Sequence, residues 1–196
     1  MAGLRQRKKE RTRREFEEAA MRLFRDQGYE ETTVEDIAEV VGVSARTFFR
    51  YYAGKEAVLF GPWRTMLGEI VRLYAARPRD ESLLASARAV CVLIAQTMEA
   101  DEAHQRFVKN IVAGSATAGD YERSVMLPAF ESALVEATAR RLDVDADADL
   151  RPALAASVSI ATMHAAKMRW VAREGSSLVA LTHEAFDALE GLLRKG

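Results

Sequence analysis

The pattern of apolar and polar positions between residues 33 and 42 predicts a short amphipathic helix. Thr33 can act as its N-cap, with Asp36 three residues later in the place that Glu takes in a capping box. Gly42 can adopt the left-handed backbone conformation that ends a helix and reverses the chain. The apolar positions recur at the helical spacing i, i+3, i+4 and i+7, so that one face should be buried: Val34, Ile37, Ala38 and Val41.

A second short helix is expected directly after this turn. Ser44 can cap it, and Val43 and Phe48 flank the cap at the spacing of a hydrophobic staple. Its outer face carries Arg46 and Arg50. An arginine near the start of such a helix can pair with guanine in the major groove of DNA. The two helices therefore predict a helix-turn-helix, although a surface helix with two arginines would show the same short pattern.

The segments on either side complete a small helical domain. An apolar stripe at helical spacing precedes Gly28 and predicts an earlier helix: Phe16, Ala19, Ala20, Leu23 and Phe24. Downstream, Lys55 and Glu56 open another helix. With these flanks, residues 14–59 closely resemble the DNA-binding domain of the tetracycline repressor (TetR) family. The resemblance is carried by AAMRLFRDQGYEETTVEDIAEVVGVSARTFFRYYAGKEAVL, which contains the Thr-Thr cap, the Gly-Val-Ser turn and the Lys-Glu pair typical of that family.

This resemblance implies a role for individual residues of the helix-turn-helix. The residues implied to contact phosphates are Thr33, Ser44, Thr47, Tyr51 and Lys55, and those implied to face the bases are Ala45, Arg46 and Arg50. Two positions depart from the family pattern: Phe49 replaces a Tyr whose hydroxyl binds a phosphate, and Tyr51 replaces a His. Arg46 stands where a small residue is common, so the operator sequence is expected to differ from those of better-known relatives.

The distribution of charge supports a polyanionic partner, although the whole chain has a formal net charge of −1. The first fourteen residues hold only Glu10 against seven cations, which gives +6 there and about −7 elsewhere: Arg5, Arg7, Lys8, Lys9, Arg11, Arg13 and Arg14. We expect a basic arm before the first helix that enters the minor groove or contacts phosphates; a disordered tail is the alternative. DNA affinity should then fall steeply with salt.

Beyond residue 56 the chain shows helical periods and almost nothing typical of a strand. We therefore predict an all-α protein with a DNA-binding domain at 1–55 and a helical effector-binding and dimerisation domain at 56–196. Helix breaks are expected at 61–62, 77–80, 99–102, 114–120, 142–149 and 175–176. Pro62 should bend the connection to the body unless it lies in the first turn of a helix.

The last two predicted helices are apolar over wide faces. Residues 153–172 are studded with small side chains that permit close helix packing, and the final segment carries Leu178, Leu181, Ala185, Phe186, Leu189, Leu192 and Leu193. In the family that the chain resembles, these helices form a four-helix dimer interface. A two-fold homodimer would place two recognition helices in successive major grooves. Packing within one subunit is the alternative.

The family resemblance also implies a pocket for a small-molecule effector, which no motif defines. Our candidates are Trp63, Met66, Ile70, Cys91, Met98, Phe107, Ile111, Met126, Phe130 and Met163. Each is equally explained as a core residue. Arg88 and Arg106 lie near these positions and favour an acidic amphipathic ligand such as an acyl-coenzyme A derivative. The single cysteine excludes an intramolecular disulfide, and the three histidines lack metal-ligand spacing, so neither metal nor cofactor is expected.

Together these features predict a cytoplasmic homodimeric repressor that binds a palindromic double-stranded DNA operator and leaves it when an apolar or acyl-type molecule is bound. An effector-independent architectural DNA-binding protein on the same fold is the alternative. No enzyme is predicted, because the chain has no phosphate loop, nucleophile elbow or His-Glu-x-x-His motif. Neither a secretory signal nor a membrane-spanning segment is expected.

Overall fold

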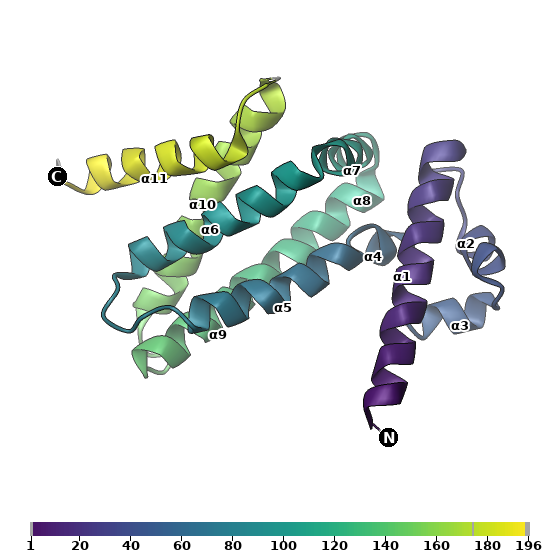
Figure 1. The fold of residues 1–196 in the computed structure, drawn as a ribbon, viewed down its shortest axis with the longest axis horizontal. Helices are drawn as coiled ribbons and strands as arrows, with labels where there is room; N and C mark the ends of the chain where they lie inside the picture. The colour runs from purple at the N-terminus through teal and green to yellow at the C-terminus, as the bar shows by residue number, and fades with distance from the viewer. Residues whose placement is uncertain (1, 174, 195–196) are drawn as a thin grey trace. The chain divides into compact units, whose positions relative to one another are not determined.

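The computed structural model describes residues 2–173 and 175–194, and within these ranges it contains helices and no strand (Figure 1). The prediction of an all-α fold is confirmed. The α-helices are α1 (Ala2–Asp26), α2 (Val34–Val41), α3 (Ala45–Phe49), α4 (Lys55–Leu59), α5 (Gly61–Ala75), α6 (Leu83–Ala100), α7 (Glu102–Gly114), α8 (Ala116–Tyr121), α9 (Leu127–Leu142), α10 (Leu150–Ala172) and α11 (Leu178–Arg194). A π-helical segment, η1 (Glu122–Met126), joins α8 to α9.

The chain forms two compact units. The first comprises Met1–Met66 and Val108–Met126, and the second comprises Leu67–Phe107 and Leu127–Gly196. The sequence analysis placed a single boundary between residues 55 and 56. In the structure the first unit also includes residues 56–66, the end of α7, all of α8 and η1, which come from the predicted helical body.

The first unit has an aromatic core between α1 and the helix-turn-helix. Phe16 of α1 is fully buried, and its ring meets that of Phe48 edge-on at 5.2 Å between centroids. Ile37 of α2 is also fully buried, and Phe24 packs edge-on against Tyr29 at 4.9 Å. The apolar stripe of α1 therefore forms the predicted three-helix core together with α2 and α3. The buried aromatic rings stabilise this core, because each removes a large apolar area from water.

The basic segment at the N-terminus differs from the expected arm. It is the start of α1, which runs without a break from Ala2 to Asp26. The reason is local: residues 6–15 contain no Gly or Pro, and Arg11 pairs with Glu15 at i,i+4 spacing. The side chain of Arg5 lies outside the described part of the structure. An arm that precedes the first helix and a disordered tail are therefore both wrong for residues 6–14.

The second unit is built on α6, α9, α10 and α11. Helix α10 packs against α6, α9 and α11, and α11 also packs against α6. Trp170, Leu178 and Phe186 are almost completely buried in this core. Helix α6 is long and apolar enough by composition to cross a membrane, with a mean hydropathy of 1.4. Its contacts with α10 and α11 nevertheless make it a core helix of this unit.

A buried arginine fastens the loop between α5 and α6 to α9. Arg141 is 9% exposed, and its guanidinium donates to the backbone oxygens of Pro78 and Glu81 at 2.6 and 2.7 Å and to the hydroxyl of Ser86. Hydrogen bonds from Arg77 and then Ser86 hold the pKa of Glu81 at about 2. The guanidinium thus adds a donor to Pro78 O, which also accepts from the Glu81 amide at 3.2 Å, and supplies one to Glu81 O.

At two of the expected helix breaks, the structure differs from an interruption between helices. Pro62 lies in the first turn of α5, where a proline is tolerated because the first amides of a helix have no acceptor within it. Between residues 114 and 120, where a break was predicted, Ser115 accepts a hydrogen bond from the Ala118 amide and starts α8. Small residues and Gly119 conceal this short helix in the sequence pattern.

Candidate nucleic-acid interface

The start of α2 is fixed by a complete capping box. Thr33 Oγ1 accepts a hydrogen bond from the Asp36 amide at 3.1 Å, and Asp36 Oδ2 accepts one from the Thr33 amide at 2.9 Å. The Thr33 side chain and backbone hold the pKa of the Asp36 carboxyl below its usual value. The predicted cap is confirmed, with Asp performing the part usually taken by Glu.

The turn between α2 and α3 follows the expected geometry. Gly42 has φ of +77°, in the left-handed region that favours glycine. The amides of Gly42 and Val43 donate to Glu39 O and Ala38 O, both at 2.9 Å, so that the last carbonyls of α2 are satisfied. Ser44 Oγ then accepts from the Thr47 amide at 3.3 Å and caps α3. These caps fix where α3 begins.

Helix α3 presents a cationic outer face above a buried anchor. Phe48 is fully buried, whereas Arg46 and Arg50 are exposed and Phe49 is 55% exposed. Neither Arg46 nor Arg50 forms an ion pair with a residue that the structure describes. Two such guanidinium groups are available to an anionic or hydrogen-bonding partner such as DNA.

Most of the other residues that the resemblance assigned to DNA contacts lie on α3 or next to the ends of α2 and α3. Thr33 and Ser44 are exposed at the starts of α2 and α3, where their side chains act as caps. Ala45 and Thr47 are half-buried on α3. Tyr51 follows α3, and its ring lies 5.6 Å from that of Phe16. All of these residues belong to the first unit.

Lys55 is held by the protein itself. Its ammonium donates to the backbone oxygens of Tyr29, Glu30 and Thr32 at 2.7, 3.1 and 3.2 Å, and its side chain is 17% exposed. An ammonium has three N–H donors, so these three acceptors engage all of them. A phosphate contact would require one of them to be given up, and that contact remains a prediction. Sequence spacing gave no signal of this arrangement.

Helix α8 brings part of the body against the helix-turn-helix segment. It packs on α4, and the ring of Tyr121 stacks on that of Phe60 at 5.6 Å with 7° between their planes. Tyr29, before α2, donates its hydroxyl to Glu56 at 3.1 Å. Burial, followed by the charge of Glu56, raises the pKa of Tyr29. The first unit therefore links α8, α4 and the loop before α2.

The ten candidate effector residues divide between the two units. Trp63, Met66, Ile111 and Met126 belong to the first unit, and Ile70, Cys91, Met98, Phe107, Phe130 and Met163 belong to the second. In the second unit Ile70, Cys91, Met98 and Phe130 are at most 7% exposed, while Phe107 and Met163 are half-buried. Burial raises the pKa of the Cys91 thiol to about 12, which is typical of an inert core cysteine.

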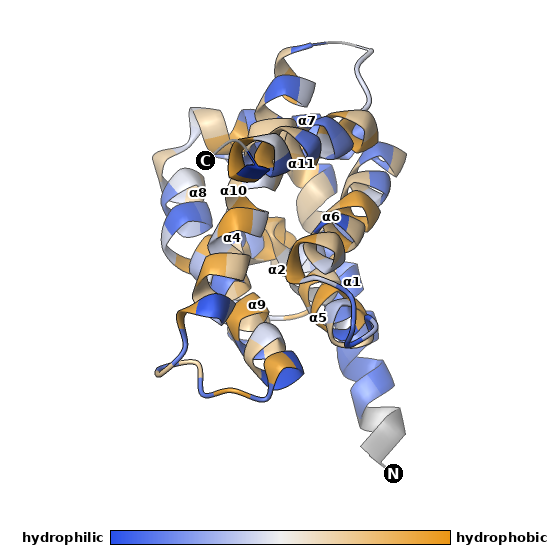
Figure 2. Ribbon diagram, turned by 90° about the vertical axis from the view of Figure 1, so that its left-hand side faces the viewer, coloured by the Kyte–Doolittle hydropathy of each residue, from blue (hydrophilic) through white to orange (hydrophobic). Residues whose placement is uncertain are grey.

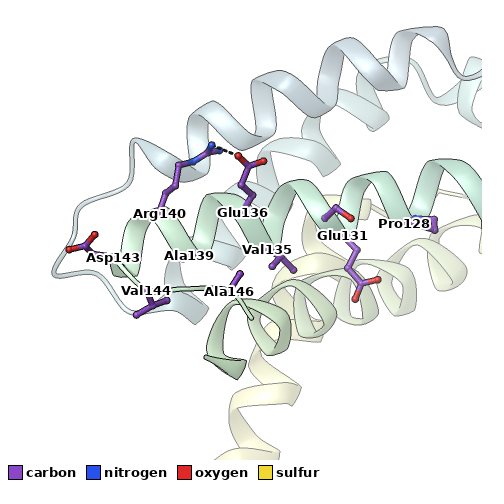
Figure 3. Close-up of a pocket in the computed structure, with 10 residues that line it drawn as sticks. Pro128, Glu131, Val135, Glu136, Ala139, Arg140, Asp143, Val144 and Ala146 are labelled. Carbon is purple, nitrogen blue, oxygen red and sulfur yellow. Dashed lines mark hydrogen bonds and ion pairs between the residues drawn. The ribbon is translucent and has the colours of Figure 1, made fainter. Parts of the chain in front are cut away.

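A cavity of about 610 Å³ lies elsewhere, along α9 and the loop that follows it (Figure 3). None of the ten candidate effector residues lines it. Its lining includes the apolar Val135 and Val144 and the carboxylates of Glu131, Glu136 and Asp143. Arg140 contributes positive charge, but it is paired with Glu136 at 2.6 Å. An acidic ligand would therefore be disfavoured here, and the effector pocket remains a prediction.

Comparison with known proteins gives two family matches that together span most of the chain. Residues 18–60 match the model of "Bacterial regulatory proteins, tetR family". Residues 81–194 match the "MftR C-terminal domain". The HTH-type transcriptional regulator TcmR of Streptomyces glaucescens is 32% identical over 197 residues, covering 97% of this chain and 86% of that protein.

Solved structures share the fold at lower sequence identity. A transcriptional regulator from Syntrophomonas wolfei has a TM-score of 0.63 at 18% identity, covering 93% of this chain and 95% of that chain. The regulator FadR of Bacillus subtilis in complex with stearoyl-CoA has a TM-score of 0.55 at 18% identity (89% and 96% coverage). FadR of Thermus thermophilus, a repressor in complex with lauroyl-CoA, has a TM-score of 0.53 at 23% identity (90% and 92%).

Proposed function

The chain belongs to the tetR family of bacterial regulatory proteins, and we propose that this DNA-binding transcriptional regulator is a homodimeric repressor released from its operator by a small amphipathic molecule. The observation that supports the proposal most strongly is the exposure of Arg46 and Arg50, which pair with no described carboxylate, on a helix that two caps hold in place. A protein of this kind acts on the chromosome, which places it in the cytoplasm.

In the proposed complex, α3 lies in the major groove. Arg46 and Arg50 read base edges together with Ala45, because a guanidinium presents paired donors that match guanine O6 and N7. Thr33, Ser44, Thr47 and Tyr51 contact phosphates and fix the position of α3. Lys55 holds the loop before α2 through hydrogen bonds to three backbone carbonyls. It contacts a phosphate only if it gives up one of these hydrogen bonds.

Phe49 offers a gain-of-function test of this placement. Its ring is 55% exposed on α3, and it stands where the family pattern has a phosphate-binding Tyr. Phe49→Tyr should tighten binding to all duplexes by about 1 kcal/mol, because the added hydroxyl donates to a phosphate. Fluorescence anisotropy with the selected operator and with a scrambled duplex measures the change. A tighter complex with the operator alone would place residue 49 at a base, and unchanged binding would place it away from DNA.

The homodimer is proposed from the exposed apolar residues of α10 and α11. Leu150 and Leu154 of α10 are 76% and 61% exposed, and Leu192 and Leu193 of α11 are 75% and 68% exposed. Figure 2 shows apolar colouring on both helices. Exposed large apolar side chains on neighbouring elements are typical of a protein interface. A two-fold pair of these helices would also supply the two recognition helices that a palindromic operator needs.

The effector is proposed to be an acyl-coenzyme A or a similar amphipathic acid. Two FadR proteins of the same fold are solved with stearoyl-CoA and lauroyl-CoA. Arg106, a candidate for the acidic group, is paired with Glu102 at 2.7 Å and lies 5.7 Å from the ring of Trp170. Arg88 is paired with Asp187 and Glu190. A ligand carboxylate or phosphate would have to compete with these carboxylates.

Release from DNA requires that the effector bind more tightly to a conformation that does not fit the operator. We place the coupling in the first unit, where α8 packs on α4 through Phe60 and Tyr121. Helix α8 is followed directly by the π-helical segment η1. Such π-helical turns frequently occur at functional sites, which supports a role for this region in the coupling. A shift of α8 would act on α4 and, through Lys55 and Glu56, on the loop before α2.

The effector is tested with stearoyl-CoA and lauroyl-CoA, with free coenzyme A as the control. Each acyl-CoA should raise the unfolding temperature and release the operator, since a ligand at about 100 times its dissociation constant stabilises the folded state by about 2.7 kcal/mol. Free coenzyme A should do neither at the same concentration. Operator binding that no acyl-CoA alters, together with an unchanged unfolding temperature, would contradict the acyl-CoA assignment. The architectural alternative gains support if no other amphipathic acid acts either.

A further inference from the structure

The first turns of α1 carry positive charge that the described residues do not neutralise. We call residues 6–14 the α1 extension. Arg7, Lys8, Lys9 and Arg14 are exposed there, and none forms an ion pair with a residue in the described ranges. Arg11 is paired with Glu15 at 3.1 Å. Figure 2 shows this part of α1 as strongly hydrophilic.

Arginines of the helical body contrast with this extension. Many of them are paired with carboxylates at neighbouring positions or on adjacent helices: Arg72, Arg77, Arg88, Arg106, Arg123, Arg140, Arg151 and Arg169. Pairing cancels much of the field that a charge projects into solvent. The extension and α3, with Arg46 and Arg50, therefore share an uncancelled positive potential within the first unit.

The packing of α1 places the extension next to α3. The hydroxyl of Tyr52, just after α3, donates to Glu17 at 2.7 Å and approaches Arg13 O at 3.5 Å. Residues 13–17 of α1 therefore lie beside the end of α3, and the extension continues from there for about 10 Å at 1.5 Å per residue. Arg13 Nε is buried and has no hydrogen-bond partner among the described residues. This N–H donor at the base of the extension is therefore unsatisfied.

The composition of the extension determines which polyanion it fits. Residues 5–14 contain no apolar side chain, so this segment lacks the apolar face with which an amphipathic helix enters a membrane surface. Duplex DNA, in contrast, presents one negative charge for about every 1.7 Å of its axis. A helix about 10 Å or more in diameter does not fit into a minor groove about 6 Å wide. Of the two DNA contacts expected for this basic segment, its helical form disfavours entry into the minor groove and favours contact with phosphates.

We propose that the α1 extension binds the DNA phosphate backbone beside the groove that α3 enters, and supplies affinity without reading sequence. The inference rests on the proposed function for the position of α3 on DNA. Contacts with phosphate release counterions, so they set the dependence of affinity on salt, whereas discrimination among sequences comes from base contacts. The extension thus raises affinity for every duplex alike, and Arg46 and Arg50 select among them.

The test compares the wild-type chain with the triple variant Arg7→Gln, Lys8→Gln and Lys9→Gln. The matched control is Arg72→Gln, Arg123→Gln and Arg140→Gln, which removes the same charge from exposed, paired arginines. Dissociation constants are measured between 50 and 200 mM NaCl for a genomic fragment selected by the wild type and for a scrambled duplex of equal length. Circular dichroism checks that both variants remain folded.

The extension variant should bind both duplexes more weakly, with their affinity ratio unchanged. The slope of log K against log salt should become shallower by about 0.9 for each phosphate that the variant no longer neutralises. For each such phosphate, the loss of affinity between 50 and 200 mM NaCl should be about threefold smaller than in the wild type. The control should keep the wild-type slope. An unchanged slope in the extension variant, an equal change in the control, or a weakening restricted to the selected fragment would overturn the proposal. If the wild type itself does not prefer the selected fragment, the proposed regulator fails, whereas a shallower slope on scrambled DNA would still support the extension.

Discussion

Replacing Arg46 with alanine should reduce operator affinity by about 1 to 3 kcal/mol and relax the sequence preference at one base pair of each half-site. The side chain is exposed on α3, and no described carboxylate competes for its guanidinium. The Ser44 cap and the buried Phe48 keep α3 in place when the side chain is removed. Affinities for a set of operators with single base-pair changes measure both effects.

Arg22→Ala is the matched control for this experiment. Arg22 is exposed on α1, so its removal takes the same charge from the same unit without altering α3. The control should retain the base preference of the wild type. An Arg46→Ala protein that binds operator and scrambled DNA with the wild-type ratio would show that Arg46 does not read a base.

Replacing Arg141 with alanine should lower the free energy of unfolding by about 3 kcal/mol. The change removes the guanidinium that donates to Glu81 O, to the buried Ser86 hydroxyl and to Pro78 O, which retains only the Glu81 amide, and it opens space beside Ser86 and Tyr74. Hydrogen bonds from a charged group contribute about 1.5 to 3 kcal/mol each, and three are lost together, which is why the effect should be large for a single substitution. Urea unfolding at one fixed protein concentration measures the difference.

The neighbouring Arg140→Ala provides the control. Arg140 and its partner Glu136 are 57% and 67% exposed, and exposed ion pairs contribute less than about 1 kcal/mol. The two substitutions remove the same side chain from adjacent positions of α9, so a comparison isolates the buried contacts. Equal losses of stability in the two variants would mean that the contacts of Arg141 with the loop between α5 and α6 do not stabilise the protein.

The helix-turn-helix was predictable from sequence because local signals agreed there. Thr33, Gly42 and Ser44 each fix a helix end through bonds within four residues, and the apolar spacing of α2 gives its buried face directly. Signals of this kind do not depend on distant parts of the chain. The same reasoning found the aromatic core, since Phe16 and Phe48 lie on the predicted inner faces of their helices.

Features that depend on distant residues were not predictable. Lys55 bonds to carbonyls 23 to 26 residues away, and Arg141 reaches Ser86 and the turn before it across more than fifty residues. The spacing of residue types along the chain does not indicate contacts between such distant residues. The N-terminal arm was misread for another reason. Its charges indicated a solvated segment, whereas the absence of Gly and Pro from residues 6–15 and the pairing of Arg11 with Glu15 favour helix.

The candidates for the effector site were chosen only by residue type, as apolar, aromatic and sulfur-containing side chains, because no motif defines the site. Ile70, Cys91, Met98 and Phe130 are buried, which suits a core as well as a pocket. Methionine and aromatic side chains fill both kinds of space, so residue type alone does not separate them. None of the candidates lines the cavity beside α9, and its carboxylate-rich lining would not be selected by a search for acyl-binding residues.

The central claim is that a two-fold dimer reads a specific operator through α3. Selection of genomic fragments by the purified protein at moderate salt, followed by footprinting of the best fragment, tests it most directly. The account predicts one protected palindrome whose half-sites are separated by about one helical turn or more. Binding that is sensitive to salt but protects no particular sequence would contradict it.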